Sequence, residues 1–254
     1  MDAVNNSFPI HRSAELLVNL TDELKRLRRN PETDPHSPHI KYLGLLLVHT
    51  IRQVQAICIL IDNPAPVYAE QAGQLLRGLC EIYAKAAWMM HPETESERDY
   101  RALCLEKSSI VKEHLSEDQQ REVIVLVGID KYEEEVSELS KPPSTKDMLS
   151  EIGASDVYDF FRWESSAVHM SLTTLATTVH GFDTKTGHVM LGGPNHPVHR
   201  AMRLWLALDI LRRIADVVIT GSCRKSHDWE NIRSTITAEI VGLLSPLAVA
   251  EVTT

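Results

Sequence analysis

Four side chains that could do chemistry recur at helical spacing between residues 158 and 169. They are Tyr158, Arg162, Ser165 and His169, separated by four, three and four positions. Such spacing places all four on one stripe of an α-helix. Histidine exchanges protons near neutral pH, and arginine binds a phosphate or carboxylate through two hydrogen bonds. We therefore predict a catalytic site on this stripe. The alternatives are that the polar face is simply solvated, or that His169 is an ordinary core histidine with satisfied hydrogen bonds.

A second polar stripe lies earlier in the chain, on a segment that is otherwise strongly apolar. Arg77 and Glu81 stand four residues apart, and Glu70, Gln74 and Lys85 lie on or beside the same face. On a wet surface such a pair adds only about 0.3–0.5 kcal/mol to stability, whereas on a buried helix both charges need partners. Both interpretations stay open. In the second, Arg77 and Glu81 bind substrate in a pocket where the two helices meet, close to Ser165 and His169.

Other kinds of site find little support in the sequence. A serine nucleophile activated by His169 would have an elbow turn and a third, orienting acid, and neither is evident. The 12 histidines form no H-E-x-x-H motif, and no E-x-x-H falls on the predicted helices. We therefore predict no metal site. No glycine-rich phosphate loop occurs, and no cofactor is predicted.

The acidic composition limits the partners that the chain can bind. Asp and Glu number 35 against 26 Lys and Arg, for a net charge of −9. Broad binding to nucleic acid or to an anionic membrane depends on many basic residues, so we expect no membrane association and only a local anion site. The four cysteines form no C-x-x-C pair, and neither a secretory leader nor an apolar run of about 18 residues is present. These features predict a reduced, cytoplasmic protein without a transmembrane helix.

The distribution of apolar residues predicts an all-α fold, a single multi-helix bundle with a small β-hairpin insertion. Apolar residues recur at helical spacing along most of the chain, and we predict one domain over residues 1–254, with N-terminal helices in 12–139 and C-terminal helices, including the site helix, in 155–247. Residues 182–191 predict a hairpin that lies on the helices. The predicted helices cover residues 12–29, 39–62, 67–91, 94–115, 121–139, 146–152, 155–180, 196–219 and 228–244.

Two families share these motifs. The segment Arg162-x6-His169 resembles the R-x4-6-H motif of HEPN domains, which are small all-helical modules of toxin and antiviral ribonucleases. The R-x3-E pair of the second stripe, taken with Y-x6-S-x3-H from Tyr158 to His169, resembles a family of uncharacterised bacterial all-helical proteins over roughly residues 40–180. The second resemblance is the closer one.

The HEPN resemblance implies a metal-independent ribonuclease of toxin or phage-defence type. His169 would be the general acid or base, and Arg162 would stabilise the phosphate as the 2′-hydroxyl of RNA attacks. The resemblance also implies a homodimer, for which Trp205 and Leu206 are candidate exposed apolar residues, and an antidote protein as partner. The chain departs from the motif in having Trp163 after the arginine. Two other functions fit the same residues: a non-catalytic module that binds a nucleotide or small anion, and a structural or interaction protein in which the polar cluster fixes helix register.

Overall fold

The computed structural model describes residues 8–28, 37–63, 66–112, 116–119, 141–168, 179–182, 189–191, 197–221 and 227–249. Nearly all of these residues are helical, which confirms the predicted helical bundle. The predicted helix over 121–139 lies outside the described residues. The helices are α1 (Phe8–Arg28), α2 (Pro38–Asp62), α3 (Pro66–Met90), α4 (Glu95–Lys112), α7 (Thr145–Glu151), α8 (Ser155–Val168), α10 (Pro197–Gly221) and α11 (His227–Val249).

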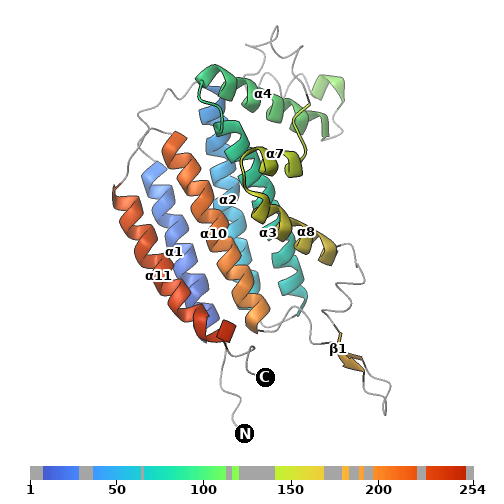
Figure 1. Ribbon diagram of the computed structural model, residues 1–254, viewed down its shortest axis with the longest axis vertical. Coiled ribbons are helices and arrows are strands. Elements are labelled where there is room, and N and C mark those ends of the chain that lie inside the picture. The colour runs from blue at the N-terminus through green and yellow to red at the C-terminus, as the bar shows by residue number, and fades with distance from the viewer. Residues whose placement is uncertain are drawn as a thin grey trace.

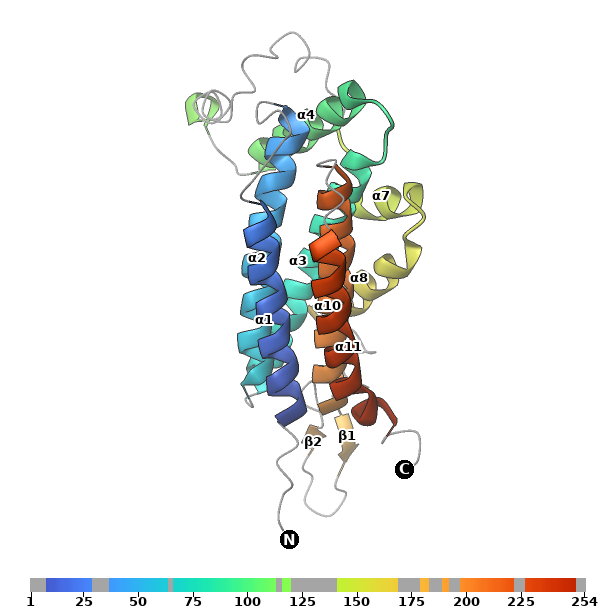
Figure 2. The same ribbon diagram turned by 90° about the vertical axis from the view of Figure 1, so that its left-hand side faces the viewer.

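The long helices lie side by side (Figure 1). α2 packs along α3, α10 packs against both, and α1 contacts α2, α10 and α11. Figure 2, turned by 90°, shows α4 crossing one end of the bundle, where it contacts α2 and α3. α7 and α8 pack against α3. The helix α3 therefore joins the long helices to the shorter ones that carry the candidate site.

The core is built from the apolar faces of the long helices. On α2, Leu43, Leu47, Val54, Ile57 and Ile61 follow one another at helical spacing and are almost fully buried. By length and composition, α2 is the one helix in the described residues that could cross a membrane, a test that the core helix of a soluble protein also passes. Here it packs against α1, α3, α4 and α10. The absence of a transmembrane helix stays a prediction.

Polar side chains hold both ends of α2. At its N-terminus, Oδ1 of Asp99 on α4 accepts the backbone N–H of His39 at 3.1 Å and the hydroxyl of Ser37 at 2.8 Å. At its C-terminus, the buried guanidinium of Arg200 donates to the carbonyl of Ile61 from two nitrogens. Helix ends carry backbone groups with no partner inside the helix. These contacts satisfy such groups and tie α4 and α10 to α2.

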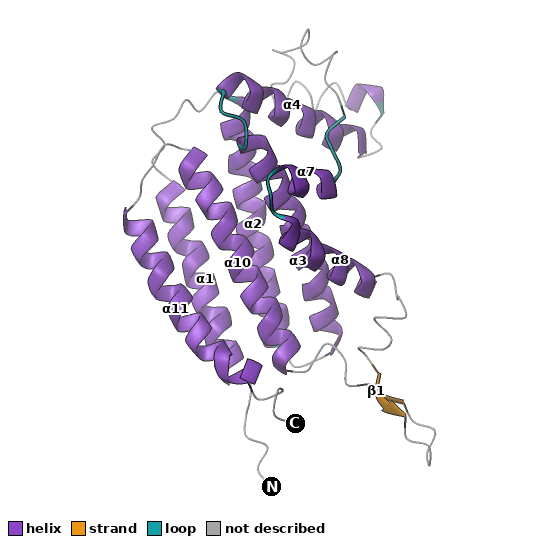
Figure 3. Cartoon of the chain, viewed as in Figure 1, coloured by secondary structure: helices purple, strands orange, loops and turns teal. Residues whose placement is uncertain are grey.

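The predicted fold class was wrong in its β part, because a β-hairpin insertion over 182–191 that lies on the helices is not seen. The bundle is built of helices alone, drawn purple in Figure 3. In this segment the described residues form only two short paired stretches, β1 (Val179–Phe182) and β2 (Val189–Leu191), with an irregular register. Neither packs extensively against a helix. A ribbon of two strands is marginal alone, so this segment adds no layer to the fold.

Two helix ends also differ from the prediction. The site helix was predicted to reach residue 180, but Val179 and His180 belong to β1, and the described part of α8 ends at Val168. The last helix was predicted to stop before Pro246, yet α11 continues to Val249. Proline removes one backbone hydrogen bond from a helix. Close to a helix end that loss is small, so the last turn still forms.

The fold separates the two residues that were predicted to form an exposed apolar pair. Trp205 is 45% exposed on α10, whereas Leu206 is only 3% exposed and faces the core. Successive residues of a helix point about 100° apart, so at the edge of a buried face only one of them lies outward. The predicted homodimer therefore keeps one of its two candidate contacts and stays a prediction.

Candidate functional site

Arg77 lies at the contact between α3 and α8. Its guanidinium carbon is 5.0 Å from the centroid of the Phe161 ring on α8, a distance at which a cation is attracted to the face of an aromatic ring. One turn further along α3, Oε1 of Glu81 lies 3.6 Å from Nη2 of Arg77. The guanidinium is thus held between a carboxylate of its own helix and an aromatic ring of the neighbouring one.

A small pocket opens beside this contact. Gln74, Arg77, Gly78 and Glu81 line it, and its volume is about 230 Å³. At Gly78, a Cβ atom would lie 3.0 Å from Oε1 and 3.1 Å from Nε2 of Gln53 on α2. These distances are shorter than ordinary van der Waals contacts. Glycine at position 78 therefore allows the amide of Gln53 to lie against α3 next to the pocket.

Polar groups around the pocket have unused hydrogen-bonding capacity. The 3.6 Å between Arg77 and Glu81 suits an ion pair but is too long for a hydrogen bond. Nε of Arg77 and Oε1 of Gln53 are buried and form no hydrogen bond with any described residue. Such an atom costs about 1–3 kcal/mol when nothing pairs with it, and a water molecule or a ligand can supply the partner.

Arg77 and Glu81, the α3 pair, lie neither on a fully solvated surface nor in a buried environment, the two alternatives that the sequence left open. The side chains of Arg77 and Glu81 are 34% and 37% exposed, so they are neither a fully solvated pair nor a buried one. Both side chains line the pocket, and the Phe161 ring of α8 lies against the guanidinium of Arg77. A ligand could therefore approach both groups without unfolding a helix.

The structure describes only part of the predicted stripe from Tyr158 to His169, which begins on α8. The ring of Tyr158 stacks on Phe161 with centroids 5.8 Å apart and planes at 19°, and the side chain of Arg162 is exposed. The backbone of Ser165 lies in α8, but its side chain and the whole of His169 lie outside the described residues. The roles predicted for the stripe, its closeness to the α3 pair, and substrate binding by that pair therefore stay predictions.

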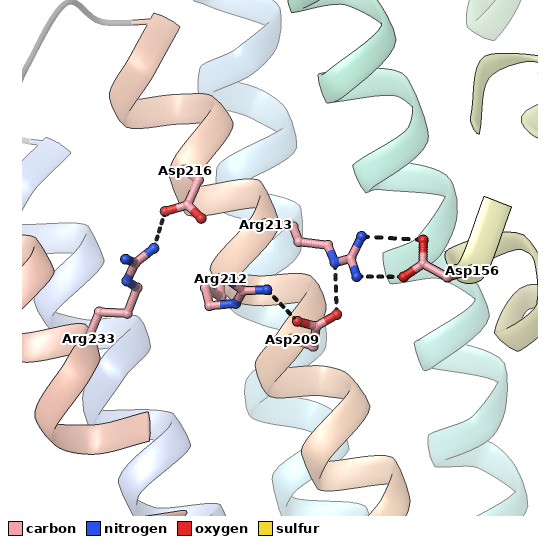
Figure 4. A network of polar contacts seen from close by, with 6 residues as sticks. All are labelled: Asp156, Asp209, Arg212, Arg213, Asp216 and Arg233. Atoms are coloured by element: carbon pink, nitrogen blue, oxygen red, sulfur yellow. Dashed lines mark hydrogen bonds and ion pairs between the residues drawn. The ribbon is translucent and has the colours of Figure 1, made fainter. Parts of the chain in front are cut away.

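A separate charged network joins α8, α10 and α11 (Figure 4). Nη2 of Arg213 donates to Asp156 at 2.6 Å, and its Nε donates to Asp209 at 2.8 Å. The guanidinium also lies 5.9 Å from the centroid of the Tyr83 ring on α3. Burial lowers the pKa of Arg213, but the two carboxylates outweigh burial and raise it overall. The charged side chains of this network pair with one another, so we interpret the network as structural. The other members are Arg212, Asp216 and Arg233.

Serine, histidine and aspartate also meet at the N-terminus of α2, but they do not form a catalytic relay. The hydroxyl of Ser37 and the carboxylate of Asp99 both contact Nδ1 of His39, at 2.7 and 2.6 Å. A relay needs the serine at the opposite ring nitrogen. Burial raises the pKa of Asp99, but hydrogen bonds from His39 and Ser37 outweigh burial and lower it overall. The cluster therefore anchors α4 on α2.

Glu106 on α4 carries a titratable carboxyl close to Lys41 and Tyr42 of α2. Burial raises the pKa of Glu106 to about 7, partly opposed by the charge of Lys41 on α2. Burial also raises the pKa of Tyr42 to about 12, against a hydrogen bond with Ser109. The Glu106 carboxyl thus changes charge near neutral pH, which makes the contact between α2 and α4 sensitive to pH.

Three of the four cysteines lie in the core. Cys58, Cys80 and Cys104 are buried as thiols, and burial raises the pKa of Cys58 to about 12. Cys223 lies outside the described residues. Within the described ranges, no three His, Cys, Asp or Glu side chains come together as metal ligands.

Three of the four residues that line the pocket, Gln74, Arg77 and Glu81, stand out in the sequence pattern, whereas Gly78 does not. The sequence pattern did not single out Phe161 or Gln53, which lie next to the pocket. An isolated glycine inside a strong helix signals close packing, and that signal could have identified Gly78. Gln53 comes from another helix, and no spacing rule connects it with α3.

Comparison with known proteins places both stripes in one family segment. No curated protein and no solved structure matches the chain significantly. The model of a family of unknown function, DUF5677, matches residues 40–187. That range holds Arg77, Glu81 and the whole stripe from Tyr158 to His169, and it agrees with the segment predicted from the motifs. The match covers more than half of the 254 residues, so the chain belongs to the DUF5677 family of unknown function.

Proposed function

We propose that the pocket on α3 binds the base of a nucleotide. The observation that carries the proposal is the placement of an arginine and a carboxylate side by side in one small pocket, 3.6 Å apart and not hydrogen-bonded to each other. Arginine only donates hydrogen bonds and an ionised carboxylate only accepts them. Together they complement a flat group that presents acceptors and donors along one edge, as a nucleobase does.

Charge and size favour a base over a free phosphate. The carboxylate of Glu81 balances the charge of Arg77, so the pocket itself offers little net attraction for an anion. Its volume of about 230 Å³ lies below the roughly 300–1,000 Å³ of sites for drug-sized ligands. The sugar and phosphate of a nucleotide would thus remain outside the pocket, where the exposed Arg162 of α8 is a candidate partner for the phosphate.

The test is calorimetric titration of the full-length protein with each of the four ribonucleoside monophosphates. We expect at least one to bind, and Arg77→Gln to weaken that binding at least tenfold, since hydrogen bonds to charged groups contribute about 1.5–3 kcal/mol. The control is Arg12→Gln, which alters an arginine paired with Glu15 on α1. Equal affinity in the Arg77→Gln and wild-type proteins would contradict the proposal.

A second candidate is metal-independent cleavage of RNA, with the same pocket holding one base of the chain. It is favoured by Arg162, whose exposed side chain directly follows the Phe161 that covers Arg77. In this candidate, His169 is the general acid or base and Arg162 stabilises the phosphate. A homodimer and an antidote protein belong to the same proposal.

Cleavage of a short single-stranded RNA in excess EDTA tests this candidate. His169→Ala and Arg162→Ala should each lower the rate by about 10²–10⁴, the usual effect of losing a general acid or base, without lowering the midpoint of thermal unfolding. A wild-type protein that binds a nucleotide but leaves RNA intact would leave binding as the function. Strong destabilisation by His169→Ala, with no cleavage by wild type, would assign the stripe to structure.

A further inference from the structure

The groups that reach the pocket define which base it can accept. Glu81 supplies a carboxylate whose oxygens only accept hydrogen bonds, and Arg77 supplies guanidinium N–H groups that only donate them. A base that satisfies both must present adjacent donors to Glu81 and an acceptor to Arg77. Gln74 can add either kind of contact, because its amide both donates and accepts.

We propose that the pocket reads the Watson–Crick edge of guanine, an inference that rests on the proposed binding of a nucleobase. Guanine carries N1–H and the N2 amino group next to each other, followed by the O6 acceptor. The two donors match both oxygens of the Glu81 carboxylate, and O6 matches Arg77. Bidentate contacts of this kind are the means by which side chains distinguish bases.

The other common bases leave part of the pair unsatisfied. The same edge of adenine has one donor group, and that of cytosine has one donor group beside two acceptors. Uracil has a single N–H between two carbonyls. In each case one carboxylate oxygen faces no donor, or faces an acceptor that repels it. A polar group left without a partner is what lets a site reject a close analogue strongly.

The surroundings restrict movement of the two reading groups. Phe161 holds the Arg77 guanidinium from one side at 5.0 Å. Arg77 and Glu81 stand on successive turns of a single helix, so their separation does not depend on a loop. On the inner side, Gln53 lies against Gly78 with its Oε1 buried and without a partner in the described residues. A site built on rigid elements in this way discriminates geometry well.

The experiment is a titration of the full-length protein with GMP, IMP and AMP, repeated with Glu81→Gln. IMP keeps N1–H and O6 but lacks the N2 amino group, so it removes one predicted contact to Glu81. We expect GMP to bind roughly tenfold or more tightly than IMP, and AMP to bind more weakly than GMP. In Glu81→Gln the preference for GMP over IMP should fall to within about twofold. Glu239→Gln, the same change at an exposed residue of α11, should leave the preference intact.

The possible results distinguish failure of the guanine assignment from failure of nucleotide binding itself. Equal binding of GMP, IMP and AMP, or a preference for GMP that survives Glu81→Gln, overturns the guanine assignment and leaves nucleotide binding standing. A failure of all four monophosphates to bind overturns nucleotide binding and the assignment together. Thermal unfolding of Glu81→Gln checks that the variant is folded. Glu81→Asp, which keeps the charge but moves it back, should weaken binding of GMP while keeping some preference over IMP.

Discussion

The guanidinium carbon of Arg77 on α3 lies 5.0 Å from the centroid of the Phe161 ring on α8. This contact couples the arginine of the pocket to the helix that carries the second polar stripe. The ring of Tyr158 stacks on the Phe161 ring, with 5.8 Å between the ring centroids. A change at Phe161 should therefore be felt in the pocket even though Phe161 does not line it.

Replacing Phe161 by leucine tests this coupling. Phe161→Leu keeps an apolar side chain but removes the ring, so the cation–π contact and the aromatic pair are lost. We expect the free energy of unfolding to fall by about 1–2 kcal/mol and ligand affinity to fall with it. Urea unfolding and calorimetric titration measure the two effects. Phe160→Leu, at a neighbour packed on the core, should lower stability without changing affinity.

Gly78 is a position where stability and binding should change in opposite directions. Gly78→Ala raises helix propensity by about 1 kcal/mol, while its Cβ would lie 3.0 Å from the flexible end of Gln53 and push that amide aside. We expect unchanged or slightly higher thermal stability and weaker nucleotide binding. Gly242→Ala on α11, where a Cβ meets nothing within 4 Å, should stabilise equally without affecting binding. Loss of several kcal/mol in Gly78→Ala would mean that Gln53 cannot move.

The adjacent residues Arg212 and Arg213 of the charged network should contribute differently to the stability of the fold. Arg213 bonds carboxylates on α8 and α10 and is 26% exposed, whereas Arg212 forms its ion pair with Asp209 on its own helix and is 40% exposed. We expect Arg213→Ala to lower the free energy of unfolding by about 1.5–3 kcal/mol and Arg212→Ala by less than about 1 kcal/mol. Denaturant titrations of the two variants give the comparison. Equal losses would show that the contact to Asp156 adds nothing.

The half-buried Glu106 should make the protein less stable as pH rises. Its pKa is raised to about 7 in the folded state from 4.5, so the folded state binds more protons than the unfolded state between these values. The contribution of Glu106 to the free energy of unfolding is therefore fully present below about pH 4.5 and is lost as pH rises through 7. After allowance for the solvent that reaches this carboxyl, the change is on the order of 2 kcal/mol.

Urea unfolding at pH 5 and pH 8 measures this effect. Glu106→Gln cannot ionise, so the difference between the two pH values should shrink by about the amount assigned to Glu106. The variant should also be more stable than the wild type at pH 8. The exposed Glu239→Gln serves as the control and should keep the wild-type difference. An unchanged pH dependence in Glu106→Gln would place the titrating group elsewhere.

The helices of this fold could be predicted because their signals are local. Apolar residues at helical spacing, with prolines between them, located α2 and α3 to within a residue at each end. The predicted ribbon at 182–191 failed as part of the fold because strand composition does not say what a strand packs against. Likewise, spacing on α10 did not decide whether Trp205 or Leu206 lies outward, since that depends on where the neighbouring helices end.

The candidate site shows the same division between local and distant information. Arg77 and Glu81 are neighbours on one helix, so their pairing could be predicted from four-residue spacing. The contacts with Phe161 and Gln53 depend on how α8 and α2 cross α3. Such crossings are set by packing of side chains along whole helices, and no short motif encodes them. The sequence therefore indicates residues of α3 for the pocket, but not the contacts that Phe161 and Gln53 make beside it.

The bond from Arg200 to the carbonyl of Ile61 has a consequence for how the family segment behaves. Arg200 and all of α10 follow residue 187, where the family match ends. Yet α10 packs along both α2 and α3, and its Leu204, Leu211 and Ile214 are fully buried. A fragment of residues 40–187 would expose those faces to water and leave the end of α2 uncapped. We therefore expect residues 40–187 not to fold stably on their own, because α1 and α10 complete the core around α2 and α3.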